Sequence, residues 1–327
     1  MRTHFTNTAS SLKEGFSPTK VLEIGSNDGV FIKNFDSNDT IAVEPCSNFA
    51  EITNDKGYHT YPEFWTTALS SQILEDHGKQ DLIFSANCMC HIQDLDDAFT
   101  AIKALLSDDG VFVFEDPALD KMIERNSYDQ IYDEHAHIFS VTALKNILNN
   151  NGLDIFRVDN LSVHGGTNRL YVKHKNNNKF SIQTSVDLNL QREQELGLKK
   201  YSTYIKFAEK VKQSKSDLVN LLDTLKKQGK KIVSYGATSK STTVFNYCGI
   251  TTDQIDYIVD TTPHKQGKLS PGTHIPVVSP ETGFNDSVDV AFLGAWNFED
   301  EILSKESNFI ESGGFFVSHV PQVRQVR

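Results

Sequence analysis

The densest run of acid and base groups in this 327-residue sequence lies between Asp129 and His137. Its nine residues, Asp-Gln-Ile-Tyr-Asp-Glu-His-Ala-His, combine a phenol, three carboxylates and two imidazoles. Histidine titrates close to neutral pH and can act as a general base, and a tyrosine hydroxyl can donate to a developing oxyanion. An ordinary solvated helix has the same composition, so the elements around this run must decide between the two interpretations.

Helical spacing divides this run into a working pair and a supporting residue. On an α-helix, Tyr132 and His135 share a face, whereas Glu134 points about 100° or more away from them. We therefore expect His135 to be the base and Tyr132 to be the hydrogen-bond donor. Glu134 is expected to orient a neighbouring group or to raise the basicity of the imidazole, and His137 to be a bystander.

A second group of candidate residues follows the first predicted strand. Glu23, Gly25, Asn27 and Gly29 alternate along a stretch that predicts a strand, a tight turn and then a helix. Glycine permits a sharp turn and a close approach of a ligand to the backbone, and asparagine tolerates the left-handed region. Glu44 ends the next predicted strand, where an acidic side chain can accept hydrogen bonds from ribose hydroxyls.

Two cofactors fit a strand followed by such a loop, a dinucleotide and S-adenosylmethionine. A dinucleotide needs helix-terminal amides for its pyrophosphate, and the carboxylate of Asp28 would repel that group. Glu23 and Asp28 suit a cofactor with sulfonium and ammonium groups, and Asn87 after the fourth predicted strand belongs to the same expected site. We therefore predict S-adenosylmethionine, with a structural turn that binds no ligand as the alternative.

Short apolar runs that alternate with helical segments predict an α/β fold with a parallel sheet and right-handed crossovers. In the first half, strands are expected at 20–24, 40–44, 57–60, 81–85 and 110–115, a helix at 95–106, and an antiparallel pair at 154–161 and 168–174. In the second half, strands are expected at 231–235, 255–260, 288–293 and 314–318, and a helix at 241–247. The predicted divisions are a domain at 1–178, a helical connector at 179–229 and a C-terminal α/β domain at 230–327.

Two further segments carry candidates for substrate binding. His164, Asn168 and Arg169 lie on the predicted hairpin, where Arg169 is the expected partner of a diphosphate or sugar oxygen. Gly236 and Lys240 lie where a strand turns into a helix, and small residues, hydroxyls and a lysine there predict a diphosphate cradle.

Each of these segments has a structural alternative. The hairpin can be a Gly-Gly turn with a surface arginine, and the second segment can be an α/β turn without a ligand. Lys265, after the next strand, can add positive charge to the cradle, and Trp296 and Phe298 are expected to be core residues.

Charge and cysteine content limit the classes of partner. The net charge of -11 and the pI of about 5.5 argue against nucleic acid and anionic membranes, because both require clustered positive charge. A local basic pocket for a phosphorylated small molecule remains compatible with this charge. The four cysteines lack zinc-finger spacing, so no metal site is predicted. Without a signal peptide or an apolar run of membrane-spanning length, a cytoplasmic enzyme is expected.

Four motifs occur in order along the chain and together resemble one family. They are Val-Leu-Glu-Ile-Gly-Ser-Asn-Asp-Gly, Tyr-Asp-Gln-Ile-Tyr-Asp-Glu-His, His-Gly-Gly-Thr-Asn-Arg and Tyr-Gly-Ala-Thr-Ser-Lys-Ser. The sequence resembles the sugar C-methyltransferases of deoxysugar pathways, which use S-adenosylmethionine to methylate C3 of a nucleotide-linked 4-keto-6-deoxy sugar. The resemblance extends over nearly the whole chain.

This resemblance implies a class I, Rossmann-like methyltransferase domain followed by a second, smaller Rossmann-like α/β domain. It implies catalytic roles for Tyr132, Glu134 and His135, and a C-terminal domain that helps to hold the nucleotide sugar. The 4-keto group would acidify the C3 hydrogen, so a base near C3 would generate an enolate that accepts the methyl group.

One departure from the family pattern concerns the N-terminus. Members of the family usually begin with a small cysteine-rich zinc domain and a segment that carries another active-site tyrosine, and both are expected to be missing here. A shortened chain, a second chain that supplies the missing part, or a different substrate would each account for this departure.

Other functions compete with carbon methylation. An O- or N-methyltransferase would need only a base on a hydroxyl or amine, a role that the same histidine can fill. A cofactor-binding partner subunit without full activity is the non-enzymatic alternative. An oxidoreductase is the weakest candidate because of the repulsion between Asp28 and a pyrophosphate.

Overall fold

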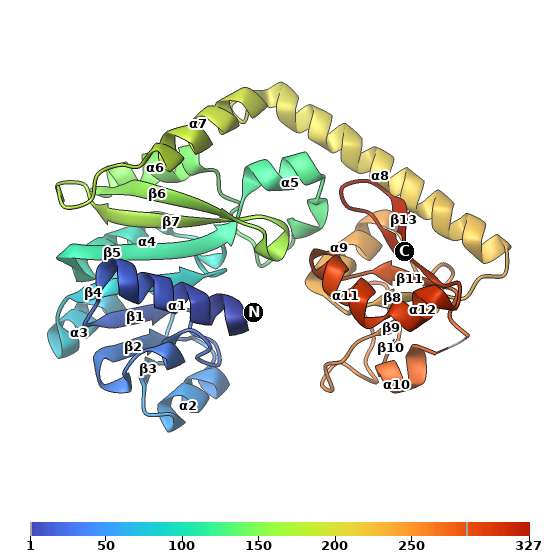
Figure 1. Ribbon diagram of the computed structural model, residues 1–327, viewed down its shortest axis with the longest axis horizontal. Coiled ribbons are helices and arrows are strands. Elements are labelled where there is room, and N and C mark those ends of the chain that lie inside the picture. The colour runs from blue at the N-terminus through green and yellow to red at the C-terminus, as the bar shows by residue number, and fades with distance from the viewer. Residues whose placement is uncertain (1, 286) are drawn as a thin grey trace. The chain divides into compact units, whose positions relative to one another are not determined.

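The computed structural model describes residues 2–285 and 287–327, which form two compact α/β units (Figure 1). The first unit comprises residues 2–119, 136–162 and 166–196, and the second comprises residues 120–135, 163–165 and 197–327. This division differs from the predicted domains at 1–178 and 230–327, because the chain enters the second unit twice before residue 178. Residues 129–135 of the acid and base run, which include Tyr132 and His135, therefore belong to the second unit, whereas Ala136 and His137 belong to the first.

The first unit is built on a seven-stranded sheet with the order β3-β2-β1-β4-β5-β7-β6. Only β7 runs antiparallel to its neighbours. The strands are β1 (Val21–Ile24), β2 (Thr40–Val43), β3 (His59–Tyr61), β4 (Gln80–Ala86), β5 (Leu106–Pro117), β6 (Leu153–Leu161) and β7 (Thr167–His174). The helices are α1 (Arg2–Phe16), α2 (Ser47–Asp55), α3 (Thr67–His77), α4 (Leu95–Leu105), α6 (Val141–Asn150) and α7 (Thr184–Leu196).

Alternating side chains of these strands supply two hydrophobic faces, as the period of two in a strand requires. Leu22 and Ile24 belong to a core that also contains side chains of α3, α4 and α6. Val21 belongs to the core on the opposite face, which Ala9 and Leu12 of α1 help to form. Helices thus cover both faces of the sheet, and the predicted parallel α/β arrangement is confirmed (Figure 1).

Two local predictions in the first half were wrong, and a third was confirmed. The loop after β1 leads into a short 3₁₀ turn at Ile32–Asn34 rather than an α-helix. Residues 131–140 form a loop with a turn, not the expected helix. The two antiparallel strands of the hairpin are confirmed, and the connection at 162–166 contains a 3₁₀ turn at Val163–Gly165.

The second unit contains a six-stranded sheet with the order β10-β9-β8-β11-β12-β13, in which only β13 is antiparallel. Its strands are β8 (Ile232–Tyr235), β9 (Tyr257–Val259), β10 (Val277–Val278), β11 (Val290–Leu293), β12 (Phe315–Ser318) and β13 (Arg324–Val326). The remaining helices are α5 (Leu119–Arg125), α8 (Tyr201–Lys227), α9 (Ser239–Cys248), α10 (Pro280–Gly283), α11 (Glu299–Lys305) and α12 (Ser307–Glu311).

The predicted connector at 179–229 is two helices, and they belong to different units. Glu193 of α7 caps α6 in the first unit, since its carboxylate accepts hydrogen bonds from the amides of Val141 (2.6 Å) and Thr142 (2.8 Å). The longer helix α8 buries an apolar stripe that includes Leu218 and Leu222. It is therefore a packed helix of the second unit and not a solvated connector.

None of the helices within residues 2–285 and 287–327 is both long enough and apolar enough to cross a membrane.

Candidate functional site

The predicted cofactor residues meet at one edge of the first sheet. In the parallel register, Ile24 at the end of β1 lies opposite Val43 of β2 and Ser85 of β4. The segments that leave these strands carry Gly25, Glu44 and Asn87, so the three ends converge at the carboxyl edge. This edge is where ligands bind in open parallel α/β sheets.

The loop after β1 adopts the backbone that its residue types predicted. Gly25 and Asn27 both lie in the left-handed region, with φ of 76° and 49°. A Cβ atom added to Gly25 would lie 2.8 Å from the Sγ atom of Cys88, so no larger residue fits there. The conformation of the loop is therefore set by a glycine and an asparagine in the left-handed region.

Glu44 ties this loop to the end of β2. Its Oε2 atom accepts a hydrogen bond from the Asn27 amide at 2.8 Å, and its Oε1 atom accepts one from the Cys46 amide at 2.9 Å. Each carboxylate oxygen has a further lone pair. Glu44 can thus organise the loop and still accept a hydrogen bond from a ribose hydroxyl.

Glu23 is a buried carboxyl group beside this loop, and only 4% of its surface is exposed. Burial raises its pKa well above the ordinary value; a hydrogen bond from the Ile32 amide opposes this shift, and the charges of Asp28 and Glu44 add to it. Its Oε2 atom has no hydrogen-bond partner among the residues that the structure describes. An unsatisfied carboxylate oxygen at this position fits the ammonium group of the expected cofactor.

Asp116 at the end of β5 is a second buried carboxyl group at this edge, and the sequence analysis missed it. Burial raises its pKa to about 7, and its Oδ2 atom also has no partner among the described residues. The adjacent pair Glu115 and Asp116 before a proline was the available signal. In a strand, neighbouring side chains point to opposite faces, so at least one member of such a pair faces a covered side of the sheet.

Arg169 is buried and forms an ion pair within the first unit, so the alternative prediction of a Gly-Gly turn with a surface arginine is wrong for this residue. Its Nε atom donates to Glu115 at 2.7 Å, and its Nη2 atom donates to Thr8 of α1 at 2.6 Å. The other Glu115 oxygen lies 2.7 Å from Nε2 of His4. These contacts hold α1 onto the sheet, and they lend no support to the predicted role of Arg169 in binding a substrate oxygen.

The other two hairpin candidates are separated from each other. Asn168 is buried in β7 of the first unit, where its Oδ1 atom accepts a hydrogen bond from Asn160 at 2.6 Å. His164 lies in the short segment that belongs to the second unit and has a left-handed backbone with φ of 52°. The three hairpin residues therefore do not form one common site within either unit.

Tyr132 and His135 are brought together by a turn instead of a helix. The His135 amide donates to the Tyr132 carbonyl at 2.9 Å, and the two ring centroids are 4.0 Å apart. The Nδ1 atom of His135 lies 2.7 Å from the Gln130 carbonyl oxygen. Because a carbonyl oxygen can only accept, the proton resides on Nδ1 and Nε2 is the basic nitrogen.

A cavity of about 540 Å³ in the second unit is lined in part by Tyr132 and Glu134. The first turn of α9 contributes the hydroxyl groups of Thr238 and Ser239, and the segment after β9 contributes Lys265 and Lys268. Hydroxyls, a helix N-terminus and two cations form a suitable environment for a diphosphate group. This cavity joins part of the predicted catalytic run to the predicted cradle within a single unit.

Gly236 and Lys240 occupy positions that differ from the expected cradle. Gly236 has φ of 102° and carries the chain from β8 into α9, which explains the requirement for glycine there. Lys240 is not among the residues that line the cavity. Burial lowers the pKa of Lys240, and the nearby charge of Asp129 opposes that shift.

Lys268, which the sequence did not single out, lines the cavity where Lys240 was predicted to lie. It lies three residues after Lys265 on the wall of the cavity. Lys265 itself donates to the Ala237 carbonyl at 2.7 Å and lies 3.5 Å from Asp260. The paired spacing Lys-x-x-Lys after a strand was the signal that could have identified both residues.

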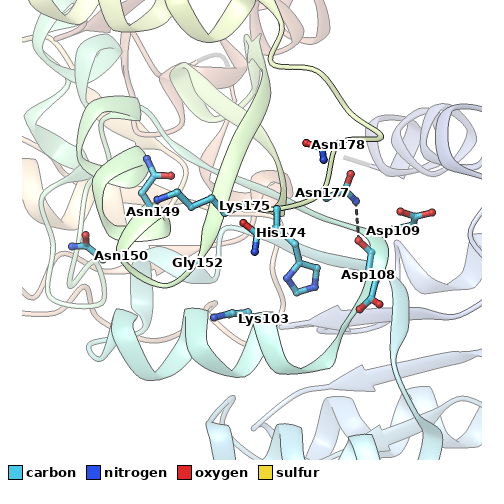
Figure 2. Close-up of a pocket in the computed structure, with 11 residues that line it drawn as sticks. Lys103, Asp108, Asp109, Asn149, Asn150, Gly152, His174, Lys175, Asn177 and Asn178 are labelled. Carbon is cyan, nitrogen blue, oxygen red and sulfur yellow. Dashed lines mark hydrogen bonds between the residues drawn. The ribbon is translucent and has the colours of Figure 1, made fainter.

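A polar pocket in the first unit has a volume of about 640 Å³, and Figure 2 shows the residues that line it. It lies at the start of β5 and the end of β7, so it is at the sheet edge opposite to Gly25 and Asn87. Asn177 there donates to the Asp108 carbonyl at 2.8 Å. None of the predicted site residues lines this pocket.

Comparison with known proteins gives matches over both halves of the chain. Residues 4–158 match the methyltransferase domain family, and residues 162–321 match the family described as the C-methyltransferase C-terminal domain. The C-methyltransferase NovU of Streptomyces niveus is 31% identical over 308 residues, which are 94% of this chain and 73% of that protein.

Solved structures with some similarity are methyltransferases of low sequence identity. An S-adenosylmethionine-dependent methyltransferase from Clostridium acetobutylicum has a TM-score of 0.42, is 14% identical and covers 53% of this chain and 92% of its own. An O-methyltransferase of Brevibacillus brevis, in complex with S-adenosyl-L-homocysteine, has a TM-score of 0.41, is 14% identical and covers 58% of this chain and 78% of its own.

The environment of Glu23 predicts how a Glu23→Gln variant will behave. When folding raises the pKa of a carboxyl group, the contribution of that group to the free energy of unfolding is complete below its pKa in the unfolded chain. The contribution is lost as pH rises through its pKa in the folded protein. The variant should therefore lose less stability than the wild type as pH rises above about 4.5. Its affinity for S-adenosylhomocysteine should fall at least about tenfold, because a charge-assisted hydrogen bond is removed.

Calorimetry of binding and chemical denaturation at several pH values would measure both effects. Wild-type affinity should increase as pH rises toward the raised pKa of Glu23, since the cofactor's ammonium group favours the ionised carboxylate. The exposed Glu14 provides a control in Glu14→Gln, which should behave as the wild type. Unchanged cofactor affinity in Glu23→Gln would exclude this contact.

Proposed function

This chain belongs to the C-methyltransferase family, and we propose that it methylates C3 of a nucleotide-linked 4-keto-deoxysugar through an enolate. The family membership confirms the prediction of an S-adenosylmethionine-dependent methyltransferase. The acceptor and the enolate route are the proposal. It is supported most directly by the cavity that Tyr132 and Glu134 share with the start of α9 and two lysines.

Carbon becomes nucleophilic only when a neighbouring carbonyl group can take up its electron pair. In the proposed reaction, Nε2 of His135 removes the C3 proton, and the electrons of the C–H bond pass into an enolate whose oxygen is O4. The hydroxyl of Tyr132 donates a hydrogen bond to that oxygen as negative charge develops. When bound, S-adenosylmethionine would supply the electrophilic methyl group: its bond to sulfur would break as the bond to C3 forms, and S-adenosylhomocysteine would leave with that electron pair.

The hydrogen bonds around His135 support its role as the base. The Gln130 carbonyl keeps a proton on Nδ1, so the imidazole presents an unprotonated Nε2 before the reaction. After proton transfer, the same carbonyl accepts a hydrogen bond from an imidazolium, which strengthens that bond. The arrangement therefore stabilises the charged form of His135 that the reaction produces.

The cavity suits both ends of the proposed substrate. Lys265, Lys268 and the first turn of α9 supply positive charge and donors for a diphosphate. Leu269 and Val277 provide an apolar wall for a nucleobase. The carboxylate of Glu134 would repel phosphate, which favours placing the sugar, and not the diphosphate, beside the Tyr132 turn.

A His135→Ala variant should lose turnover while it retains cofactor binding. Removal of a general base typically lowers kcat by about 10²–10⁴-fold. In deuterated water without a methyl donor, the wild type should exchange the C3 hydrogen of a bound 4-keto nucleotide sugar for deuterium, and His135→Ala should not. Affinity for S-adenosylhomocysteine should change less than about twofold.

His137→Ala is the matched control, because the His137 amide donates to the Cys90 carbonyl at 3.0 Å and its Nε2 atom lies 3.3 Å from the Gln93 carbonyl oxygen, both within the first unit. This variant should exchange and turn over as the wild type does. Full exchange in His135→Ala would show that another residue is the base.

Lys268→Ala should weaken substrate binding without slowing the chemical step. Loss of one lysine–phosphate contact should raise KM for the nucleotide sugar about tenfold and leave kcat within about twofold. The dependence of KM on salt should also become shallower, because one screened charge interaction is gone.

Lys227→Ala provides a control, since Lys227 is exposed at the end of α8 in the same unit and does not line the cavity. Steady-state kinetics with a panel of nucleotide sugars would measure these effects. An unchanged KM in Lys268→Ala would argue that the diphosphate binds elsewhere.

A further inference from the structure

The residue just before Gln130 is a carboxylate that is held in the interior of the second unit. Asp129 is fully buried in the 3₁₀ turn Tyr128–Gln130. Its Oδ2 atom accepts a hydrogen bond from Nε1 of Trp296 at 2.5 Å and lies 3.6 Å from Nε2 of His319. A buried carboxylate in a short turn that leads directly into the predicted catalytic run requires an explanation.

The groups around Asp129 favour its ionised form. Burial favours the neutral carboxyl form, but His319, Lys240 and the Trp296 indole outweigh that effect and lower the pKa of Asp129. The ring of Tyr128 packs edge-on against His319, with centroids 5.5 Å apart, on the other side of the turn. The contacts of the Asp129 carboxylate with Trp296 and His319 thus attach the turn to the C-terminal sheet.

Trp296 is itself fixed from a second direction. A Cβ atom added to Gly165 would lie 2.2 Å from the Cη2 atom of the indole ring, so the ring packs directly on the Gly165 backbone and leaves no room for a side chain there. Trp296 follows β11 and His319 follows β12. Both partners of Asp129 are therefore positioned by neighbouring strands of the C-terminal sheet, which gives the turn a rigid support.

The carbonyl that orients His135 belongs to the residue that this support immobilises. Gln130 is buried, and its side chain donates to the hydroxyl of Ser127 at 2.8 Å. Its carbonyl oxygen lies 2.7 Å from Nδ1 of His135. A small rotation of the peptide that joins Gln130 to Ile131 would move this oxygen and remove the interaction that selects the Nδ1–H tautomer.

We propose that Asp129, held by Trp296 and His319, is a positioning residue that fixes the Gln130 carbonyl and so sets the orientation and tautomer of the His135 imidazole. This inference rests on the proposed function only in its claim that His135 is the base. Asp129 does not touch the reacting atoms in this scheme. It acts on the reaction through the backbone of Gln130.

Nitrogen NMR of protein labelled with ¹⁵N-histidine tests the positioning directly, without substrate. His135→Gln identifies the His135 resonances by their disappearance. In the wild type, the shifts should report a protonated Nδ1 and an unprotonated Nε2 at neutral pH. Trp296→Phe keeps an aromatic ring but removes the donor to Asp129, and it should shift His135 toward a mixture of tautomers.

Kinetics separate positioning from folding. Trp296→Phe and Asp129→Asn should lower kcat by about tenfold to a hundredfold and change KM for the nucleotide sugar less than twofold, because misorientation of a base affects the chemical step. Trp65→Phe is the matched control, since Trp65 is a buried donor to the Ala98 carbonyl in the first unit. It should leave kcat and the His135 tautomer unchanged.

Each result decides one part of the inference. Wild-type His135 shifts and kcat in a folded Trp296→Phe protein would overturn the positioning role and leave Asp129 as a structural residue. A changed tautomer with unchanged deuterium exchange would support the positioning role but show that His135 is not the base. If Asp129→Asn does not fold, Trp296→Phe and His319→Gln carry the same test, because each keeps the carboxylate.

Discussion

The proposed role of His135 as the base depends on one interaction, the hydrogen bond between its Nδ1 atom and the Gln130 carbonyl. It determines which imidazole nitrogen is basic, and the turn that closes around it places the His135 ring against Tyr132. The buried carboxylate of Asp129 and the C-terminal sheet are the parts of the second unit that hold the carbonyl in place.

The cofactor half depends on a different constraint, the parallel register of β1 with its two neighbours. This register brings Gly25, Glu44 and Asn87 to a common edge and buries the carboxyl group of Glu23 beside them. Burial raises the pKa of Glu23, so its ionised form is maintained at the expense of stability. Such an arrangement is typical of a ligand site, because the positive charge of a bound ligand stabilises the ionised carboxylate that burial destabilises.

Much of this architecture could be predicted from sequence because it follows from local chemistry. Alternating apolar runs specify strands, and the left-handed positions at Gly25 and Asn27 were predicted from residue type alone. The environment of Arg169 could not be predicted, since its partner Glu115 comes from a strand 54 residues earlier in the chain. The pairing of Tyr132 with His135 was predicted for the wrong reason, because a turn and a helical turn bring residues three apart together equally well.

The division of the chain into units also could not be predicted from the sequence. A polar break at 176–179 resembles a domain boundary, but α7 remains attached to the first unit through Glu193. The short segments 120–135 and 163–165 belong to the second unit because of contacts such as Asp129 with Trp296, which are 167 residues apart. Long-range pairs of this kind leave no periodic signal, so propensity and pattern cannot reveal them.

Carbon methylation is the central claim, and the structure of the product tests it most directly. The purified protein would be incubated with S-adenosylmethionine carrying a ¹³C-labelled methyl group and with a 4-keto nucleotide sugar, and the product would be examined by carbon-correlated NMR. The account predicts a labelled methyl group bonded to C3 of the sugar, which then carries no hydrogen. A labelled methyl group bonded to oxygen or nitrogen would contradict it.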